Sequence, residues 1–218
     1  MSYTPPRLSL PLLQGVPFDQ AVPTAERFKA IYDHCDLHDC RRDRNNCKTI
    51  LRFPDGTIFF DAKMAIDSDG SPRAREIDPT GRPETSHRYP NGDSFNAEHI
   101  PYIVLPLGGF IEATRLELGD LAVVVYRDKL AYALVADEGP AKKIGEGSIR
   151  LHELLPAPDP CTRRDANHQC LRVRDASIEK DVLYFIFPHS KIEGLTPQNV
   201  VALVNEKAAG LFDRLKGN

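Results

Sequence analysis

The stretch LAVVVYRDKLAYALVA, residues 121–136, decides the fold class. Two short apolar runs, 121–126 and 130–136, flank a polar turn at Arg127, Asp128 and Lys129. Short apolar runs separated by a tight polar turn are typical of a β-hairpin. We therefore expect a protein built mainly from strands, with this hairpin near its centre.

Further strands are expected on both sides of this hairpin. Residues 49–53 and 56–60 flank a Pro-Asp-Gly turn, which predicts a second hairpin. Residues 100–107 and 182–187 are apolar runs of strand length. Because no helical pattern separates the strands, they are expected to form a mixed or antiparallel sheet.

Two helices are expected outside this core. Residues 24–36 place apolar side chains on one helical face, and Thr24 is a suitable N-cap. Residues 197–216 do the same after Thr196 as N-cap and Pro197 at the first helical position. The predicted fold is therefore mainly β (α+β): a compact, barrel-like core of mixed or antiparallel strands, with a double-psi-like arrangement as one form of it.

The chain is expected to fall into two parts. Residues 1–48 contain a Pro-rich arm, the first helix and a Cys-rich loop, which should pack on the main domain at residues 49–218. Within that domain, residues 67–99 are polar and rich in turn signals. So long an irregular segment inside a domain is more often a functional loop than a linker.

Composition excludes some classes of protein. The 218 residues include 28 Lys and Arg against 31 Asp and Glu, a formal net charge of −3, without the basic excess of a nucleic-acid-binding protein. No apolar run approaches the roughly 20 residues of a membrane span. Residues 8–16 do not resemble a signal peptide. Composition alone is consistent with three alternatives: the protein stays in the cytoplasm, it is exported by another route, or the sequence is that of a mature secreted form.

The five cysteines cannot all pair internally, because their number is odd. Cys161 and Cys170 flank a charged segment and suit a disulfide that closes a surface loop. Cys35, Cys40 and Cys47 could form a pair plus a thiol, or a bridge to the second group. A zinc site that also uses His38 is an alternative, but it lacks C-x₂-C knuckles. The polar surroundings argue against buried cysteines, and we predict no metal site.

One segment carries candidate chemistry, residues 135–149. A buried strand ends at Asp137, a Gly-Pro turn follows, and Glu146 lies between Gly145 and Gly147. Flanking glycines would leave this carboxylate open to a bulky ligand. Hydrolysis of an acetal needs one neutral carboxyl to protonate the leaving oxygen and one ionised carboxylate to activate water or attack carbon. The alternative is that both are ordinary turn residues.

Five segments in order resemble family 75 of the glycoside hydrolases, the fungal-type chitosanases and their bacterial relatives. They are residues 63–72 (KMAIDSDGSP), 100–106 (IPYIVLP), 118–123 (LGDLAV), 137–149 (around KIGEGS) and 184–188 (YFIFP). The similarity runs from about residue 59 to residue 188, so residues 49–218 would form the glycoside hydrolase catalytic domain. In that family an Asp and a Glu nine residues apart are catalytic, with the Glu in a Gly-Glu-x-Ser motif. The resemblance therefore implies Asp137 and Glu146 as the catalytic pair.

The resemblance also implies a reaction: internal hydrolysis of chitosan, the β-1,4-linked polymer of glucosamine, with inversion. Inverting enzymes keep the two carboxyl groups roughly 6.5–9.5 Å apart, which leaves room for a water molecule. Either carboxyl group could be the acid. The interpretation followed here makes Glu146 the general acid, since apolar Ile144 and Ile149 could desolvate it, and Asp137 the base. No cofactor is expected.

Further residues are expected to contact the substrate. Glucosamine is cationic at mildly acidic pH, so an acidic groove would bind chitosan and discriminate against neutral chitin. The predicted substrate-binding residues are Asp61, Lys63, Asp67, Asp69, Ser86, Glu138 and Ser148. For Asp67 and Asp69 the alternatives are an Asx turn or a calcium loop, but an EF-hand would place Ala65, which cannot ligate, at its first position. Lys142 and Lys143 are either surface charges or neighbours that tune Asp137.

The predicted function is an inverting endo-acting chitosanase whose partner is a polysaccharide, with no nucleic-acid or membrane partner, acting as a monomer. One alternative is a hydrolase of a related amino-sugar polymer such as peptidoglycan. Another is a carbohydrate-binding protein that has the fold without turnover. The family resemblance suggests a secreted protein, although no signal peptide is visible.

Overall fold

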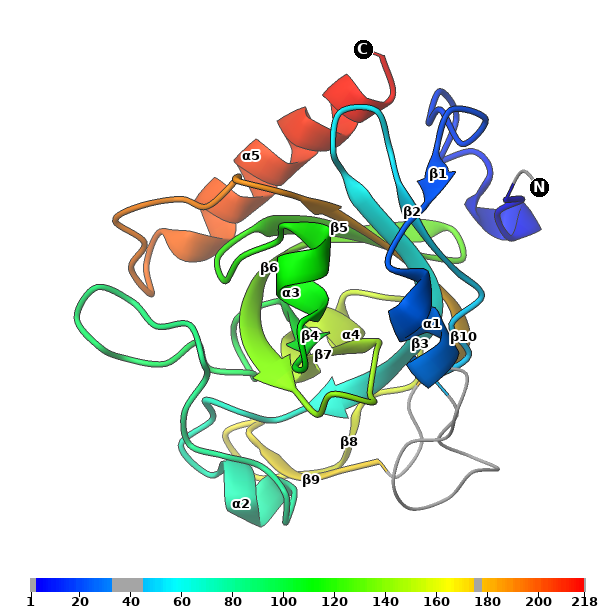
Figure 1. Cartoon of the computed structure of the whole chain (residues 1–218). Coiled ribbons are helices and arrows are strands. Elements are labelled where there is room, and N and C mark those ends of the chain that lie inside the picture. Colours follow the sequence, from blue (N-terminus) through cyan, green and yellow to red (C-terminus); the bar gives the residue numbers. More distant parts are fainter. Residues whose placement is uncertain (1–2, 33–44, 175–177, 218) are drawn as a thin grey trace.

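A computed structural model describes residues 3–32, 45–174 and 178–217 of the chain. Within them, six strands form a closed barrel, because the last strand in the sheet order pairs back onto the first (Figure 1). In sheet order they are β3 (Ile58–Asp67), β10 (Ile178–Phe187), β5 (Leu121–Tyr126), β6 (Lys129–Gly139), β4 (Tyr102–Pro106) and β7 (Glu146–Ser148). The β3–β7 and β4–β6 pairs are parallel and the others antiparallel, so the barrel is mixed.

Shorter elements surround the barrel. The additional strands are β1 (Val22–Pro23) and β2 (Thr49–Arg52), which extend the sheet beyond β3, and a separate hairpin of β8 (Cys161–Arg164) and β9 (Cys170–Val173). The helices are η1 (Arg7–Ser9), α1 (Glu26–Tyr32), α2 (Ala74–Ile77), α3 (Phe110–Thr114), α4 (Ile149–Glu153) and α5 (Val200–Leu215). In the part of the chain that is described, no helix is long and apolar enough to span a membrane.

Alternation along the strands divides the core into two layers, because successive side chains of a strand point to opposite faces. One layer fills the barrel and includes Phe60, Val124, Val135 and Tyr184. The other lies between the barrel and α5, which packs along the outside of β5 and β6 (Figure 1). It includes Val123, Leu134, Phe185 and Phe212, and the rings of Phe185 and Phe212 lie 5.2 Å apart.

The predicted mainly β, barrel-like fold is confirmed, as are both predicted hairpins, which are β2–β3 and β5–β6. The finer double-psi description stays a prediction. The C-terminal helix begins at Val200 rather than 197. Residues 196–199 form a turn before it, in which Thr196 and Asn199 exchange reciprocal side-chain hydrogen bonds of the kind that cap a helix.

The N-terminal helix was predicted over 24–36 with Thr24 as N-cap, and that start is wrong. Thr24 donates its backbone N–H to Ile50, and Ala25 has a φ of 51°, so the helix begins at Glu26. The predicted end, 33–36, lies outside the described residues. The arm before the helix packs on the outer layer through Leu13 and Phe18, whereas the domain boundary at residue 48 stays a prediction.

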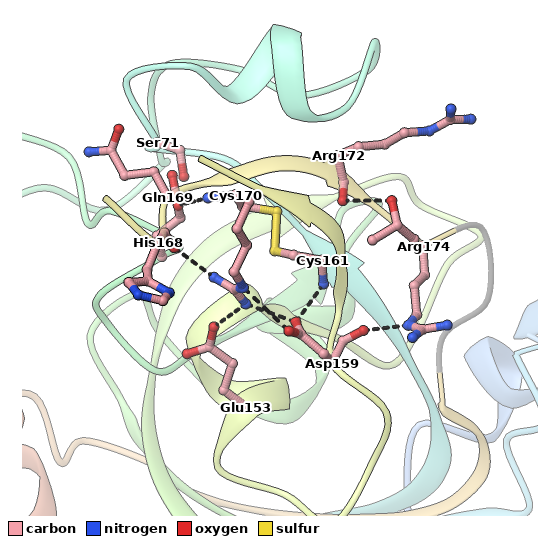
Figure 2. Close-up of a disulfide and its surroundings, with 12 residues drawn as sticks. Ser71, Glu153, Asp159, Cys161, His168, Gln169, Cys170, Arg172 and Arg174 are labelled. Atoms are coloured by element: carbon pink, nitrogen blue, oxygen red, sulfur yellow. Dashed lines mark hydrogen bonds and ion pairs between the residues drawn. A yellow bond between two sulfur atoms is a disulfide. The ribbon is translucent and has the colours of Figure 1, made fainter. Parts of the chain in front are cut away.

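The predicted disulfide between Cys161 and Cys170 is present and joins β8 to β9 (Figure 2). The expectation that cysteines avoid burial is wrong, since Cys47, Cys161 and Cys170 are all buried. The disulfide packs in a small apolar cluster with Ile77 of α2 and Ile149 of α4. Cys35, His38 and Cys40 lie outside the described residues, so the alternative of a zinc site stays a hypothesis.

Hydrogen bonds tie this hairpin to the long loop at residues 67–99. The backbone N–H of Cys170 donates to Glu98 Oε2 over 2.6 Å, and Arg73 pairs with Asp165 over 3.4 Å. On the other side, Arg164 bridges Glu153 and Asp159, two residues that also appear in Figure 2. The β8–β9 hairpin therefore supports the base of that loop.

Replacing both Cys161 and Cys170 by Ser should lower the free energy of unfolding by about 2–3 kcal/mol, because the unfolded chain regains the entropy of an open loop. Urea denaturation of the double variant and the wild type measures this difference. Arg163→Ala, an exposed change on the same hairpin, is the control and should shift the midpoint little. Equal midpoints for the double variant and the wild type would contradict the prediction.

Candidate active-site groove

A groove of about 880 Å³ lies on the outer face of the barrel, between the strand ends of β3, β7, β4 and β6 and the loop at residues 67–88. Its lining carries both signs of charge, with carboxylates in excess. The acidic residues are Asp67, Asp69, Asp78, Glu84, Asp137, Glu138 and Glu146. The basic residues are Arg75, Arg82, Arg88 and Lys143.

The two predicted catalytic carboxylates occupy one row across the sheet. Strand β4 lies between β6 and β7, and its Val104 pairs with Asp137 on one side and with Glu146 on the other. Residues directly opposite one another on neighbouring strands point to the same face, so both carboxylates face the groove on either side of Val104. Their Cα atoms are separated by two strand spacings, about 9–10 Å.

A β-bulge turns Asp137 toward the groove. Ile103 pairs with Val135 and Val104 with Asp137, which leaves Ala136 as an extra residue in β6. Before the bulge, Ala133 and Val135 point into the barrel, while Leu134 and Ala136 belong to the outer layer. With regular alternation the side chain of residue 137 would point into the barrel interior. Because Ala136 is an extra residue in the strand, the side chain of Asp137 lies on the outer face instead.

Hydrogen bonds hold Asp137 in one orientation. Its Oδ1 accepts from the backbone N–H of Ser86 over 3.0 Å, from the Ser86 hydroxyl, and from the backbone N–H of Glu138 over 2.8 Å. All three donors converge on one oxygen. Ser86, from the long loop, therefore orients the carboxylate.

Glu146 begins β7 and is 7% exposed. Its Oε1 lies 2.5 Å from the ammonium of Lys143, so Lys143 pairs with Glu146 rather than with Asp137. Its Oε2 lies over Gly139, where an added Cβ atom would come within 2.7 Å of it. Gly139 therefore makes room for the Glu146 carboxylate.

The two glycines that flank Glu146 have a different role from the one expected. A Cβ atom on Gly145, whose φ is +81°, would lie 2.1 Å from the carbonyl oxygen of Lys63. One on Gly147 would meet Leu151 at 2.8 Å. Both glycines are buried against the protein, so they permit close packing of β7 and do not open the site to a ligand.

Asn45 holds the turn that joins the two carboxylates, and sequence reasoning missed it. Its buried side-chain amide donates to the carbonyl of Lys142 over 2.9 Å and accepts from the N–H of Ile144 over 3.1 Å. Because Asn45 lies far from this turn in sequence, no local pattern points to it.

Asp67 and Asp69 also line the groove. Burial and neighbouring carboxylates raise the pKa of both residues. Asp67 Oδ1 accepts from the N–H of Asp69, the predicted Asx turn. Burial, with Asp69, Glu146 and Asp137 nearby, raises the pKa of Asp67 well above its usual value. Burial also raises the pKa of Asp69 to about 6, opposed by its 2.7 Å hydrogen bond from the N–H of Arg82.

Asp69→Asn should stabilise the protein near neutral pH. A carboxylate whose pKa is raised by folding costs stability above that pKa, while below its unfolded pKa the cost disappears. We expect a gain of about 1–2 kcal/mol at about pH 7.5, because partial exposure screens the interaction, and almost none at about pH 4. Thermal unfolding at the two pH values measures it. Asp128→Asn in the exposed β5–β6 turn is the control, and an equal gain at both pH values would contradict the assignment.

Not every predicted substrate-binding residue lies in the groove. Those that line it are Asp67, Asp69, Ser86 and Glu138. The other three, Asp61, Lys63 and Ser148, are buried and do not line the groove, so the prediction that they contact substrate is wrong.

Asp61 lies outside the groove because it is too far along β3, and Ser148 lies outside it because local hydrogen bonds hold its side chain elsewhere. Asp61 precedes Asp67 by six residues, about 20 Å along the strand, and accepts a 2.6 Å hydrogen bond from Tyr3 of the arm. Ser148 caps α4 and accepts from the N–H of Tyr102.

Arg75, Arg82 and Arg88 were also missed as groove residues. All three belong to the long polar loop at 67–99, which the sequence marks as functional without indicating which side chains face inward. The groove is therefore acidic in total but also carries arginines, of which Arg88 pairs with Glu84 over 2.6 Å.

Two carboxylates that face one groove, here from β6 and β7 on either side of β4, are compatible with the paired carboxyl groups of a glycoside hydrolase. The family model described as fungal chitosanase of glycosyl hydrolase group 75 matches residues 64–215, well over half of the chain. The chain therefore belongs to that glycoside hydrolase family, as predicted, and Asp137 and Glu146 lie within the matched residues. A search of curated proteins gave no match.

Proposed function

We propose that the protein is an inverting, endo-acting chitosanase that cleaves β-1,4 linkages between glucosamine units, with Asp137 and Glu146 as its catalytic pair. The observation that carries this proposal is the shared register of the two carboxylates with Val104, which directs both into one groove. Membership of the chitosanase family supports the substrate class.

In the proposed mechanism Glu146 is the general acid and Asp137 the general base. The ammonium of Lys143 favours the ionised form of Glu146, so substrate must displace this ion pair before Glu146 can carry a proton. Asp137 removes a proton from a water molecule, and the water oxygen bonds to the anomeric carbon from the face opposite the leaving group. The bond from that carbon to the glycosidic oxygen breaks, and Glu146 gives that oxygen its proton. The three donors on Asp137 Oδ1 leave its orientation fixed while the second oxygen faces the water.

Inversion sets a requirement on the spacing of the pair. Asp137 and Glu146 lie on either side of Val104, with their Cα atoms about 9–10 Å apart. The proposal requires their carboxyl groups to lie roughly 6.5–9.5 Å apart, which admits a water molecule.

The acidic groove suits a cationic polymer. Asp67, Asp69 and Glu138 lie beside the catalytic pair and could bind the ammonium groups of glucosamine. Burial and the neighbouring carboxylates raise the pKa of Asp67, so an ammonium group bound beside it would relieve the repulsion within this cluster.

One observation favours a second candidate, a hydrolase of peptidoglycan. Arg75 and Arg82 in the groove lining could bind the carboxylates of lactyl or peptide groups on such a polymer, whereas Arg88 already pairs with Glu84. The acidic excess around Asp137 and Glu146 favours chitosan over this alternative.

We also propose that the protein acts as a monomer outside the cytoplasm. An intact polysaccharide does not cross a membrane, and a disulfide such as Cys161–Cys170 persists in an oxidising compartment. Light scattering and cell fractionation test the two parts of this proposal.

The test of function is the release of reducing sugar from chitosan, chitin and peptidoglycan. The proposal expects activity on chitosan, a fall in viscosity that precedes most of the sugar release, and early products of inverted anomeric configuration by NMR. Activity on peptidoglycan alone would favour the second candidate. Binding of chitosan without hydrolysis would identify a carbohydrate-binding protein instead.

A further inference from the structure

The turn between the two catalytic carboxylates places a cation on one of them. Lys143 lines the groove, and its ammonium lies 2.5 Å from Glu146 Oε1. The side chain of Lys143 is only 21% exposed, so water screens this ion pair incompletely and the pair favours the ionised form of Glu146. In the free enzyme, Glu146 therefore lacks the proton that a general acid must carry.

The other carboxylates of the groove differ in how their negative charge is stabilised. Asp137 accepts three hydrogen bonds on Oδ1. Asp69 accepts the backbone N–H of Arg82, whose positive charge also favours the ionised form. Asp67 accepts the backbone N–H of Asp69 over 2.9 Å, and among the described residues no cation pairs with it. Asp67 is therefore the carboxyl group of this set that most readily holds a proton.

Asp67 is also a direct neighbour of Glu146 across two strands. Ala65 of β3 pairs in parallel with Glu146 of β7, and Asp67 follows Ala65 by two residues on the same face. The Cα atoms of Asp67 and Glu146 are therefore about 8 Å apart, one strand spacing across and two residues along. Burial, and then the charges of Asp69 and Glu146, raise the pKa of Asp67. Carboxyl groups that interact in this way titrate as a pair, so a proton on one depends on the charge of the other.

Other charged or titratable groups surround Glu146, but among the described residues none is a carboxyl group as weakly stabilised as Asp67. The hydroxyl of Tyr184 donates to the carbonyl of Lys63 over 2.8 Å, and burial keeps its pKa well above the usual value, so it retains its own proton. The surrounding groups are Asp137 of β6, Lys63 of β3, Tyr184 of β10, and Asp69, Arg75 and Arg82 of the loop.

We propose that Asp67 and Glu146 share one proton and that Lys143 determines which of them carries it. While Lys143 pairs with Glu146, the proton stays on Asp67. When substrate displaces Lys143, the O–H bond of Asp67 breaks and an O–H bond forms on Glu146, so the total charge of the two carboxyl groups is unchanged. Asp67 and Lys143 are thus positioning residues for the catalytic proton. This proposal rests on the proposed function, in which Glu146 is the general acid.

A titration of the free protein tests the shared proton without any need for activity. Carbon-13 NMR follows the side-chain carboxyl groups against pH, with resonances assigned through Glu146→Gln and Asp67→Asn. In the wild type, Glu146 should titrate at lower pH than Asp67. Lys143→Gln should move the midpoint of Glu146 upward by about one pH unit or more, because the paired cation is lost. Lys142→Gln, which changes the exposed neighbour outside the groove lining, is the matched control and should leave that midpoint unchanged.

A double variant tests the part of Asp67. In the Lys143→Gln background, Asp67→Asn should move the Glu146 midpoint back to lower pH, because the neighbouring negative charge is gone. An unchanged Glu146 midpoint in Lys143→Gln, or an equal shift in Lys142→Gln, would overturn the role of Lys143. A double variant with the same Glu146 midpoint as Lys143→Gln would overturn the sharing with Asp67.

The pH dependence of activity links this proton to the reaction. The alkaline limb of kcat/KM reports the proton that the free enzyme must carry. On soluble chitosan oligosaccharides that limb should coincide with the titration of Asp67, and Asp67→Asn should move it to lower pH. A limb that stays in place in Asp67→Asn would overturn the proposal, whereas a purely structural role would lower activity without moving the limb.

The two proposals can fail separately. If the wild type does not hydrolyse chitosan but both NMR shifts occur, the proposed function fails and the shared proton stands. If chitosan is hydrolysed but Glu146 titrates alike in the wild type and Lys143→Gln, the shared proton fails and the proposed function stands.

Discussion

Asp137→Asn and Glu146→Gln are each expected to lower kcat on chitosan by about 10³-fold, within the range for loss of a general acid or base. The amide introduced by Asp137→Asn could not take a proton from water, and the amide introduced by Glu146→Gln could not supply one to the leaving oxygen. Both substitutions keep the size of the side chain. The fold should therefore persist, and circular dichroism and thermal unfolding check this.

The matched control is Glu138→Gln, which removes a neighbouring carboxylate that faces the same groove. Its expected effect is a modest rise in KM with kcat nearly unchanged, since Glu138 would contact substrate without transferring a proton. Reducing-sugar release from chitosan measures all three variants. Activity that survives both Asp137→Asn and Glu146→Gln would disprove the assignment of the pair.

Gly139→Ala is expected to lower kcat by about 10²-fold, although the substitution adds a single methyl group. The new Cβ atom would lie 2.7 Å from Glu146 Oε2 and 3.1 Å from Val104, so the Glu146 carboxylate must move away from its position opposite Asp137. Misplacement of a catalytic group by about 1 Å is enough for a loss of this size. The backbone at Gly139 does not need the left-handed conformation, so the effect should come from the side chain alone.

Two measurements separate this effect from unfolding. The midpoint of thermal unfolding should fall little, because the Glu146 side chain can rotate into the groove. Gly210→Ala, in the middle of α5 with open space around it, is the control and should leave kcat unchanged. A Gly139→Ala enzyme with wild-type kcat would show that Glu146 does not act from the observed position.

The residues were sufficient to predict much of the local structure. The hairpin at 121–136, the hairpin around residue 55 and the C-terminal helix all follow from the spacing of apolar side chains and from turn residues. A strand end, a turn and flanking glycines made Asp137 and Glu146 candidates, and the family resemblance indicated them as the predicted pair. Ser86 was predicted to contact substrate, and its contact with Asp137 could be found only in the structure.

The errors arose where contacts join residues distant in sequence. Asp61 and Asp67 lie on the same face of β3, and only the length of that strand, together with the arm that covers Asp61, removes Asp61 from the groove. Asn45 reaches the turn before Glu146 from another part of the chain. Gly145 and Gly147 are explained by the packing of β7 against Lys63 and Leu151, which no local pattern contains.

The sequence alone predicted the strands and the C-terminal helix, because those depend on neighbours a few residues apart, and the resemblance to the family indicated the two candidate carboxylates. The tertiary structure decided that Asp137 faces outward, through the extra residue Ala136 in β6. It also decided that Glu146 lies in the same row, through the pairing of β7 with both β3 and β4. Register between strands is set by the packing of the whole barrel, and a shift of one residue would send either carboxylate to the opposite face.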